Sequence, residues 1–286
     1  MSDFVSEQLE VDDNFEAVQG LYLERGWTDG LPVVPPTLER VADMLAATPM
    51  QPQDIIGEIP PNWGSATVEK LAVNAVMAGC RPEYFPVLIA SVEAICDEAF
   101  NLYAIQATTH PCAPLIIVNG PICEELGMHG GSGAFGPGWQ PNATIGRSLR
   151  LVQLNVGGAS PGVGDMSTQG APSKYTYCVA ENEEANPWES LSIERGFRSD
   201  QNTVTVMAGE PPHNINDHSG SSAEDILTII AGAISITGAN NAYTGGETLL
   251  ALGPEHAATI AGDGFGKKEI RDWLHRNARI PLERYT

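Results

Sequence analysis

The chain has 286 residues, with 36 acidic side chains against 15 lysines and arginines, so its formal net charge is −21. A surface this negative repels phosphate backbones and anionic lipid headgroups, which argues against nucleic-acid binding and against docking on membranes. The hydrophobic fraction of 42% and the charged fraction of 18% are typical of a folded globular protein.

The charge is unevenly distributed along the chain. Residues 1–60 carry twelve acids and two bases, a net charge of −10, whereas the last twenty residues carry six bases and three acids, a net charge of +3. We therefore expect the basic C-terminal segment to dock on acidic surface, either within the fold or across a homo-oligomer.

The compartment is predicted from the cysteines and from the lack of targeting signals. The N-terminus is acidic, and the longest weakly polar run, residues 226–239, is too short to span a bilayer. The five cysteines are odd in number and widely spaced, without a C-x-x-C pattern. This usage predicts a reduced, cytoplasmic protein.

Residues 1–64 are predicted to form an N-terminal segment of helices and proline-rich connector. Apolar spacing predicts a helix over residues 11–25, and Thr37 is suited to N-cap a second helix. Residues 27–37 and 50–64 hold too many prolines and glycines for a helix, so they are expected to be an extended connector and a loop.

Residues 65–286 are predicted to form one compact α/β core, with helices flanking a mixed or parallel sheet. The run APLIIVN at 113–119 is apolar throughout, which predicts a central strand buried on both faces. Ser65 is expected to cap the first helix of the core, and Gly79 is expected to end it. The remaining predictions are helices at 66–79, 82–97, 143–156, 223–235 and 267–277, and strands at 174–180, 203–207 and 248–252.

Two segments of the core resemble each other. IIVNGP at 116–121 and LLALGP at 249–254 each read as a strand followed by Gly-Pro, and each follows an apolar helix. The match predicts a duplicated helix–strand–helix unit over residues 65–156 and 221–277.

Cys80 is the first candidate catalytic residue. It lies just before a predicted helix and beside Arg81, and both a helix N-terminus and a guanidinium group favour a thiolate. A thiolate could act as a nucleophile or a metal ligand. The alternative is a small side chain that fills the joint between two helices.

His110 and Cys112 immediately precede the central strand. Because residues i and i+2 of an extended segment point the same way, the imidazole and the thiol could share a proton or a metal ion. His213 and His218 flank a second polar loop with enough ligands for a zinc-type site. The alternatives are a histidine bonded to backbone at the strand edge and solvated loop histidines.

A glycine-rich loop spans residues 127–138. Gly131 to Gly136 match G-x-G-x-x-G, but no strand directly precedes them and no helix directly follows, so we reject a dinucleotide site. Free backbone N–H groups beside His129, together with an arginine in the next helix, could instead hold a carboxylate or phosphate. A packed surface loop is the alternative. The residues expected to bind substrate are Arg81, Gly130, Gly131, Ser132, Gly133, Asn142 and Arg147.

Five strings resemble a poorly characterised bacterial family, the selenoprotein-linked group named for a U-G-S-C motif. They are WTDGLPVVPPT at 27–37, MAGCRPEYF at 77–85, APLIIVNGP at 113–121, NATIGRSL at 142–149 and GPEHA at 253–257. The resemblance implies an intracellular α/β protein that is one component of a two-protein system. The U-G-S-C string itself is absent from this sequence.

These features favour an intracellular enzyme of the hydrolase or lyase type that acts on a small polar or anionic molecule. Its site is expected where Cys80, His110, Cys112, His129 and Arg147 converge near the end of the central strand. His110 would act as base or ligand, and the N–H groups of Gly130 to Gly133 would stabilise developing negative charge. The sequence does not determine the cofactor. The candidate is a divalent transition metal bound by His110, Cys112, His213 and His218.

Two other functions stay open. Cys80 and Cys112 could cycle as a thiol-redox pair against a partner protein. The chain could also be a non-catalytic subunit or a binding protein that holds a ligand in the glycine-rich loop.

Overall fold

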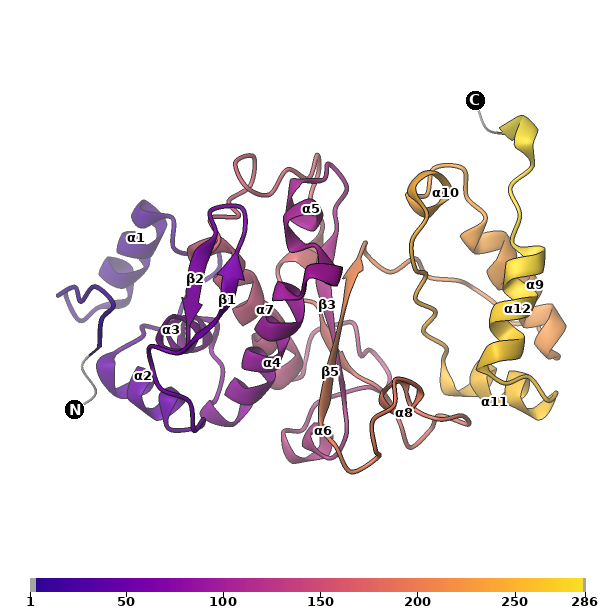
Figure 1. Ribbon diagram of the computed structural model, residues 1–286, viewed down its shortest axis with the longest axis horizontal. Helices are drawn as coiled ribbons and strands as arrows, with labels where there is room; N and C mark the ends of the chain where they lie inside the picture. Colours follow the sequence, from indigo (N-terminus) through magenta and orange to yellow (C-terminus); the bar gives the residue numbers. More distant parts are fainter. Residues whose placement is uncertain (1–3, 285–286) are drawn as a thin grey trace. The chain divides into compact units, whose positions relative to one another are not determined.

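The computed structural model describes residues 4–284 and divides into two compact units (Figure 1). Unit 1 runs to Glu181 and takes up Arg195–Pro211, whereas unit 2 holds Asn182–Glu194 and the chain from Pro212 onward. No division falls at residue 64, because Val41 and Met44 share one hydrophobic core with Leu71. Asp3, one of the acids counted at the front of the chain, lies outside the described residues.

Unit 1 contains both sheets. Its elements are α1 (Phe15–Arg25), α2 (Leu38–Leu45), β1 (Ile55–Ile59), β2 (Gly64–Thr67), α3 (Val68–Ala78), the 3-10 helix η1 (Pro82–Tyr84), α4 (Phe85–Cys96), η2 (Glu98–Phe100), α5 (Leu102–Ala107), β3 (Ala113–Asn119), α6 (Ile122–Glu125), α7 (Gln140–Asn155), η3 (Pro172–Lys174), β4 (Cys178–Ala180) and β5 (Thr203–Gly209). The fold is α/β, as expected.

The larger sheet has the strand order β4-β3-β5 and is mixed. β3 pairs in parallel with β4, Val118 opposite Ala180, and antiparallel with β5, Ile117 opposite Thr205. The predicted central strand at 113–119 is therefore confirmed, with its bounds. Its Ile116 and Val118 side chains belong to the core that α3, α4 and α7 build against the sheet.

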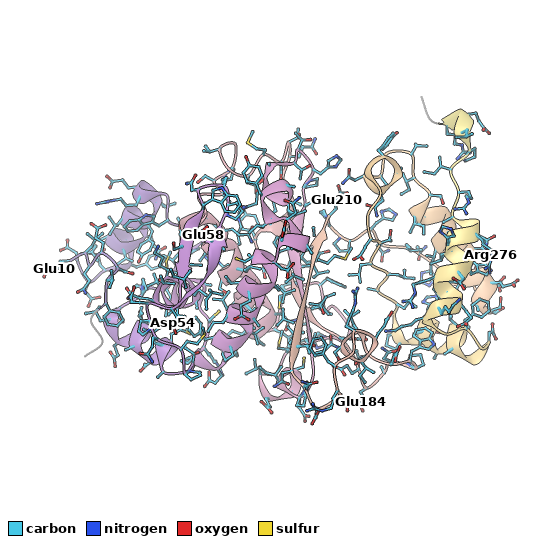
Figure 2. All side chains as sticks on the ribbon, viewed as in Figure 1. Glu10, Asp54, Glu58, Glu184, Glu210 and Arg276 are labelled. Carbon is cyan, nitrogen blue, oxygen red and sulfur yellow. The ribbon has the colours of Figure 1, made fainter. Side chains whose placement is uncertain are left out.

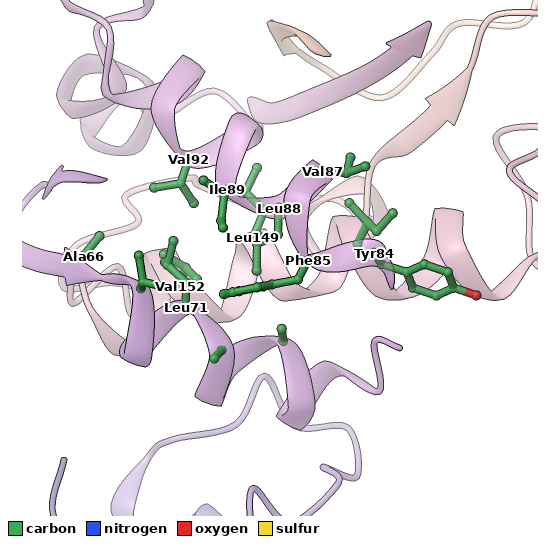
Figure 3. Close-up of a cluster of buried hydrophobic side chains, with 14 of the residues drawn as sticks. Ala66, Leu71, Tyr84, Phe85, Val87, Leu88, Ile89, Val92, Leu149 and Val152 are labelled. Carbon is green, nitrogen blue, oxygen red and sulfur yellow. The ribbon is translucent and has the colours of Figure 1, made fainter. Parts of the chain in front are cut away.

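The core of unit 1 depends on aromatic and aliphatic side chains from α3, α4 and α7 (Figure 3). Phe85 of α4 is fully buried, and Leu71 of α3 and Leu149 of α7 belong to the same cluster. Removing such large apolar surfaces from water is the main favourable term in folding.

Only the N-terminal end of α3 differs from the prediction. Gly79 ends the helix in the left-handed conformation, with φ of 88°, as expected of a C-terminal glycine. The N-cap is Thr67 rather than Ser65, because Ser65 pairs with Glu58 in the β1–β2 hairpin. Pro52 precedes the hairpin, and Pro60 and Pro61 lie in its turn. The prediction of a loop over residues 50–64 is therefore wrong for Ile55–Ile59 and for Gly64.

α7 lies close against β4 because Gly146 has no side chain. A Cβ atom at Gly146 would overlap the Thr176 hydroxyl and lie 2.7 Å from the Tyr177 amide nitrogen. The Thr176 hydroxyl uses this approach to donate a 2.9 Å hydrogen bond to the Ala143 carbonyl oxygen. This contact sets how closely α7 packs against the chain that leads into β4.

Unit 2 is helical in the part of the chain that is described. Its elements are α8 (Leu191–Glu194), α9 (Ala223–Ile234), α10 (Asn241–Thr244), α11 (Pro254–Gly262), α12 (Lys267–Asn277) and η4 (Leu282–Arg284). The helix predicted at 267–277 is confirmed with its bounds. Two cations of α12, Lys267 and Arg271, bind Glu194 of the same unit.

Two predicted strands are corrected. Residues 248–252 pair with no strand in the described part of the chain. Leu250 and Leu252 instead pack on the helical core of unit 2. The predicted duplication of residues 65–156 over 221–277 thus lacks its second strand. Only Cys178–Ala180 of the predicted strand 174–180 forms one, because Pro172 begins a 3-10 turn that ends at Lys174.

No helix within residues 4–284 is long and apolar enough to cross a membrane.

Candidate functional site

A hollow of about 290 Å³ lies in unit 1 where α2, the end of α3, η1 and the start of α7 meet. We call it the Arg81 hollow. It is lined by Val34, Arg40, Asp43, Met44, Val76, Gly79, Cys80, Arg81, Pro82 and Gln140. Two of the expected site residues, Cys80 and Arg81, lie here.

Cys80 follows the glycine that ends α3, and its N–H group donates to the Ala75 carbonyl oxygen at 3.0 Å. Burial raises the pKa of its thiol to about 11, although hydrogen bonds with Thr144 and Ser148 and the charge of Arg147 act in the opposite direction. The predicted lowering of this pKa is therefore wrong. Desolvation of the thiolate outweighs the nearby positive charge.

The charged groups of the hollow come from two elements. α2 contributes Arg40 and Asp43, and Arg81 stands at the start of η1. One Arg40 Nη atom donates to the Pro35 carbonyl oxygen at 2.9 Å, which holds its side chain beside α2. Within residues 4–284, none of these three side chains forms an ion pair.

The glycine-rich loop is held on the first turn of α7. The Asn142 side chain accepts from the His129 N–H group at 2.9 Å and donates to the His129 carbonyl oxygen at 2.8 Å. The His129 ring stacks on Trp139 with centroids 3.4 Å apart, and its Nε2 lies 2.9 Å from the Ser132 carbonyl oxygen. His129 and Asn142 therefore hold the loop in place.

The loop still exposes donors. The N–H groups of Gly130, Gly131, Ser132 and Gly133 make no hydrogen bond with any described residue. The His129 ring limits the space above them, since a Cβ atom at Gly131 would lie 2.9 Å from His129 Cε1. No acceptor among the described residues therefore competes with water or an anion for these four N–H groups.

Arg147 has a different role from the one expected. Its Nε and Nη2 atoms each donate to Asp29 at 2.9 Å, and Nη2 also donates to the Pro32 carbonyl oxygen. Both side chains are largely buried, so the guanidinium group is committed to the connector. The prediction that Arg147 binds substrate is therefore not supported by its contacts.

His110 and Cys112 belong to a second group of polar residues, at the amino end of β3. His110 Nδ1 lies 3.1 Å from Glu210 Oε1, just past the end of β5, where Figure 2 labels Glu210. The Cys112 thiol is buried, and burial and the charge of Glu210 raise its pKa, against the effect of Lys174. We call His110, Cys112, Arg150, Asp165, Lys174 and Glu210 the amino-end cluster.

Buried charges occupy the centre of this cluster. Asp165 accepts from Lys174 Nζ at 2.9 Å and lies 3.3 Å from an Nη atom of Arg150. The Ser167 hydroxyl lies 2.8 Å from Asp165 and 3.2 Å from the His110 carbonyl oxygen, which connects the buried ions to the histidine. A cavity beside them measures only about 20 Å³, room for one water-sized molecule. It is too small for an organic substrate.

The expected convergence of all these residues on one site is wrong. His129 accepts from the Ala180 N–H group at the carboxyl end of β4, and β3 runs parallel to β4. His110 and Cys112 precede the amino end of β3. A seven-residue strand separates the two places by about 20 Å, at ~3.3 Å per residue. Only the Arg81 hollow and the glycine-rich loop are neighbours, since Gln140 lines one and Asn142 holds the other.

The predicted metal ligands do not form a metal site in the described part of the chain. No group of three or more His, Cys, Asp and Glu side chains within residues 4–284 could hold a metal ion. His110 and Cys112 belong to unit 1, and His213 and His218 belong to unit 2. In the loop of His218, Asp217 instead accepts from the N–H groups of Ser219 and Gly220.

Several site residues were missed at the level of sequence. The spacing of Arg40 and Asp43 could have identified them, because they lie three residues apart and share a helical face with Met44. No sequence pattern identifies Asp165 or Glu210, since only the fold brings them close to His110.

No family model, characterised protein or solved structure matches this chain. The resemblance to the U-G-S-C group stays a prediction.

The Asp29–Arg147 pair predicts a pH-dependent contribution to stability. Burial alone would raise the pKa of Asp29, but hydrogen bonds and the charge of Arg147 hold it below its usual value. A carboxyl group with a lowered pKa stabilises the fold above its unfolded pKa of about 3.9, and this contribution is lost as the pH falls through the folded value. We expect Asp29→Asn to lower the free energy of unfolding by about 3 kcal/mol at pH 7 and by progressively less below pH 4, measured by urea denaturation.

Asp200→Asn is the matched control, because Asp200 pairs with Arg198 on the surface, where both side chains are about 70% exposed. This substitution should change stability by less than about 1 kcal/mol. Equal effects of the two substitutions at pH 7 would contradict a structural role for the Asp29–Arg147 pair.

The raised pKa of Cys80 predicts slow alkylation. With a pKa of about 11, its thiolate fraction at pH 7.4 is about 300-fold below that of an ordinary cysteine with a pKa of about 8.5. Iodoacetamide labelling followed by peptide mass spectrometry should show a rate that rises about tenfold per pH unit up to about pH 10. The same cysteine in urea-unfolded protein serves as the control, and labelling at equal rates in both states at pH 7.4 would refute the prediction.

Proposed function

We propose that this protein binds a small organic anion in the Arg81 hollow. The observation that carries the proposal is a hollow of about 290 Å³ lined by two guanidinium groups and one carboxylate. Ligand pockets for small molecules measure about 300–1,000 Å³, so the hollow suits a small metabolite rather than a nucleotide cofactor.

The sign of the charge in the hollow supports an anionic ligand. The C-terminal end of α3, at Gly79, and the N-terminal end of α7, at Gln140, both line it, and their helix dipoles oppose each other. The side chains therefore decide the sign: Arg40 and Arg81 against Asp43 leave a net charge of +1. In a chain of net charge −21, a local positive site selects anions from solution.

The remaining lining favours a ligand with an apolar body. Val34 is an exposed apolar side chain of the lining, and Met44 and Val76 separate the hollow from the hydrophobic core. Pockets of this kind combine an apolar lining with a few polar groups that set orientation. A carboxylate or phosphate attached to a short carbon chain meets both conditions.

The thiol-redox alternative has less support. Burial raises the pKa of the Cys80 and Cys112 thiols, and the attacking species in thiol–disulfide exchange is the thiolate. Cys80 lines the Arg81 hollow, whereas Cys112 belongs to the amino-end cluster, so the two do not form a pair.

A hydrolase or lyase is the second candidate, with acid–base catalysis at the amino-end cluster. The observation that favours it is the His110–Glu210 contact of 3.1 Å. A carboxylate on one ring nitrogen orients the imidazole and leaves the other nitrogen to accept a proton from a substrate or a water molecule. His110 is about half exposed, so it is accessible to a substrate from solution.

Substitution of the arginines tests anion binding. We expect butyrate, succinate, benzoate or inorganic phosphate to bind the wild-type protein in isothermal titration calorimetry. Arg81→Ala should weaken binding about 10- to 100-fold, because a hydrogen bond to a charged group contributes about 1.5–3 kcal/mol. Arg40→Ala should have an effect of similar size, and the double variant should not bind.

Arg198→Ala is the control, because Arg198 is an exposed arginine of the same unit outside the hollow. It should leave the affinity unchanged. Failure of all four probes to bind at 10 mM, or equal weakening by Arg198→Ala, would overturn the proposal.

Acid–base catalysis is tested with a panel of small esters and hydroxy acids. Activity toward any of them should fall about 100- to 10,000-fold in His110→Ala and less in Glu210→Gln, which keeps the base but loses its charged partner. His213→Ala, a substitution in an exposed loop of unit 2, is the control. Turnover by His110→Ala at the wild-type rate would exclude this candidate.

A further inference from the structure

We propose that the Arg81 hollow selects zwitterions of the amino-acid type, with Asp43 as the acceptor for their ammonium group. This inference rests on the proposed anion binding and names the class of ligand more narrowly. It is carried by a carboxylate that lines the same small hollow as two guanidinium groups without forming an ion pair with either.

The arrangement begins with the face of α2. Arg40, Asp43 and Met44 lie at positions i, i+3 and i+4, and all three line the hollow. Residues with this spacing are neighbours on one side of a helix. One helical face thus offers a positive, a negative and an apolar group to the same ligand.

The two charges on this face do not neutralise each other. Arg40 donates to the Pro35 carbonyl oxygen, and no ion pair joins it to Asp43 within residues 4–284. Arg81 approaches from the start of η1 and forms no ion pair there either. A simple carboxylate would satisfy the arginines and would be repelled by Asp43. A molecule with both an anionic and a cationic group satisfies all three.

The size of the hollow agrees with this class. About 290 Å³ accommodates the main-chain atoms of an amino acid and an aliphatic side chain of four or five heavy atoms. Val34, which is exposed, supplies apolar surface for that side chain, and the buried Met44 and Val76 lie beneath the hollow.

The test compares ligands that differ only in the ammonium group. L-leucine is paired with 4-methylpentanoate, and L-methionine with 4-(methylthio)butanoate, in calorimetric titrations of the full chain. We expect each amino acid to bind about tenfold more tightly than its deaminated partner. Asp43→Asn should weaken the binding of the amino acid. The affinity for the simple carboxylate should stay the same or increase. The ratio of the amino-acid affinity to the carboxylate affinity should therefore fall toward one.

Glu39→Gln is the matched control, because Glu39 precedes Arg40 on α2, is exposed and does not line the hollow. This substitution should leave the ratio at its wild-type value. The effect of Asp43→Asn on folding is checked by its thermal unfolding midpoint, which should not change for an exposed side chain.

The outcomes separate the two proposals. If the carboxylates bind as tightly as their amino acids, or if Asp43→Asn keeps the wild-type ratio, the selection of zwitterions by Asp43 is refuted while anion binding stands. If neither member of any pair binds and the simple anions also fail, both proposals are refuted.

Discussion

The close approach of α7 to β4 at Gly146 is the constraint on which the rest of unit 1 depends. Any side chain at Gly146 would collide with the backbone and hydroxyl group that precede β4. With this contact made, α7 contributes polar residues to several places in unit 1. In its first turn Gln140 lines the Arg81 hollow and Asn142 holds the glycine-rich loop. Further along the helix, Arg150 reaches the buried Asp165 of the amino-end cluster.

The two arginines of the Arg81 hollow carry positive charge that is not neutralised by an ion pair within residues 4–284 and that faces one hollow. In this acidic chain, Arg147 is bound to Asp29, Lys174 to Asp165, and Lys267 to Glu194. Arg40 and Arg81 line a hollow and form no ion pair among the described residues. Glu194 also gives part of the basic C-terminal helix an acidic partner within unit 2. Association between copies of the chain stays a prediction.

Features that depend on a few neighbouring residues were predictable from sequence. The strand at 113–119 and the helix at 267–277 have the predicted bounds, and Thr37 and Gly79 cap their helices as expected. Features that depend on the pairing of strands were not predictable from sequence. The β1–β2 hairpin, with Pro60 and Pro61 in its turn, was not predicted. The apolar run at 248–252 was predicted to be a strand, although it pairs with no strand among residues 4–284. An apolar run shows that a segment is buried, but it does not show what covers it.

The sequence by itself determined the α/β class, the order of the main elements and the residue types from which a site could be built. The tertiary structure decided which of those residues meet. It separated His110 from His129 because a strand lies between them, and it assigned Arg147 to Asp29, 118 positions away in sequence. It also set the protonation of Cys80, because burial opposes a thiolate more strongly than the nearby charge favours it. The distance between two side chains and the desolvation of a thiol depend on how the whole chain packs, so neither can be deduced from a local pattern of residues.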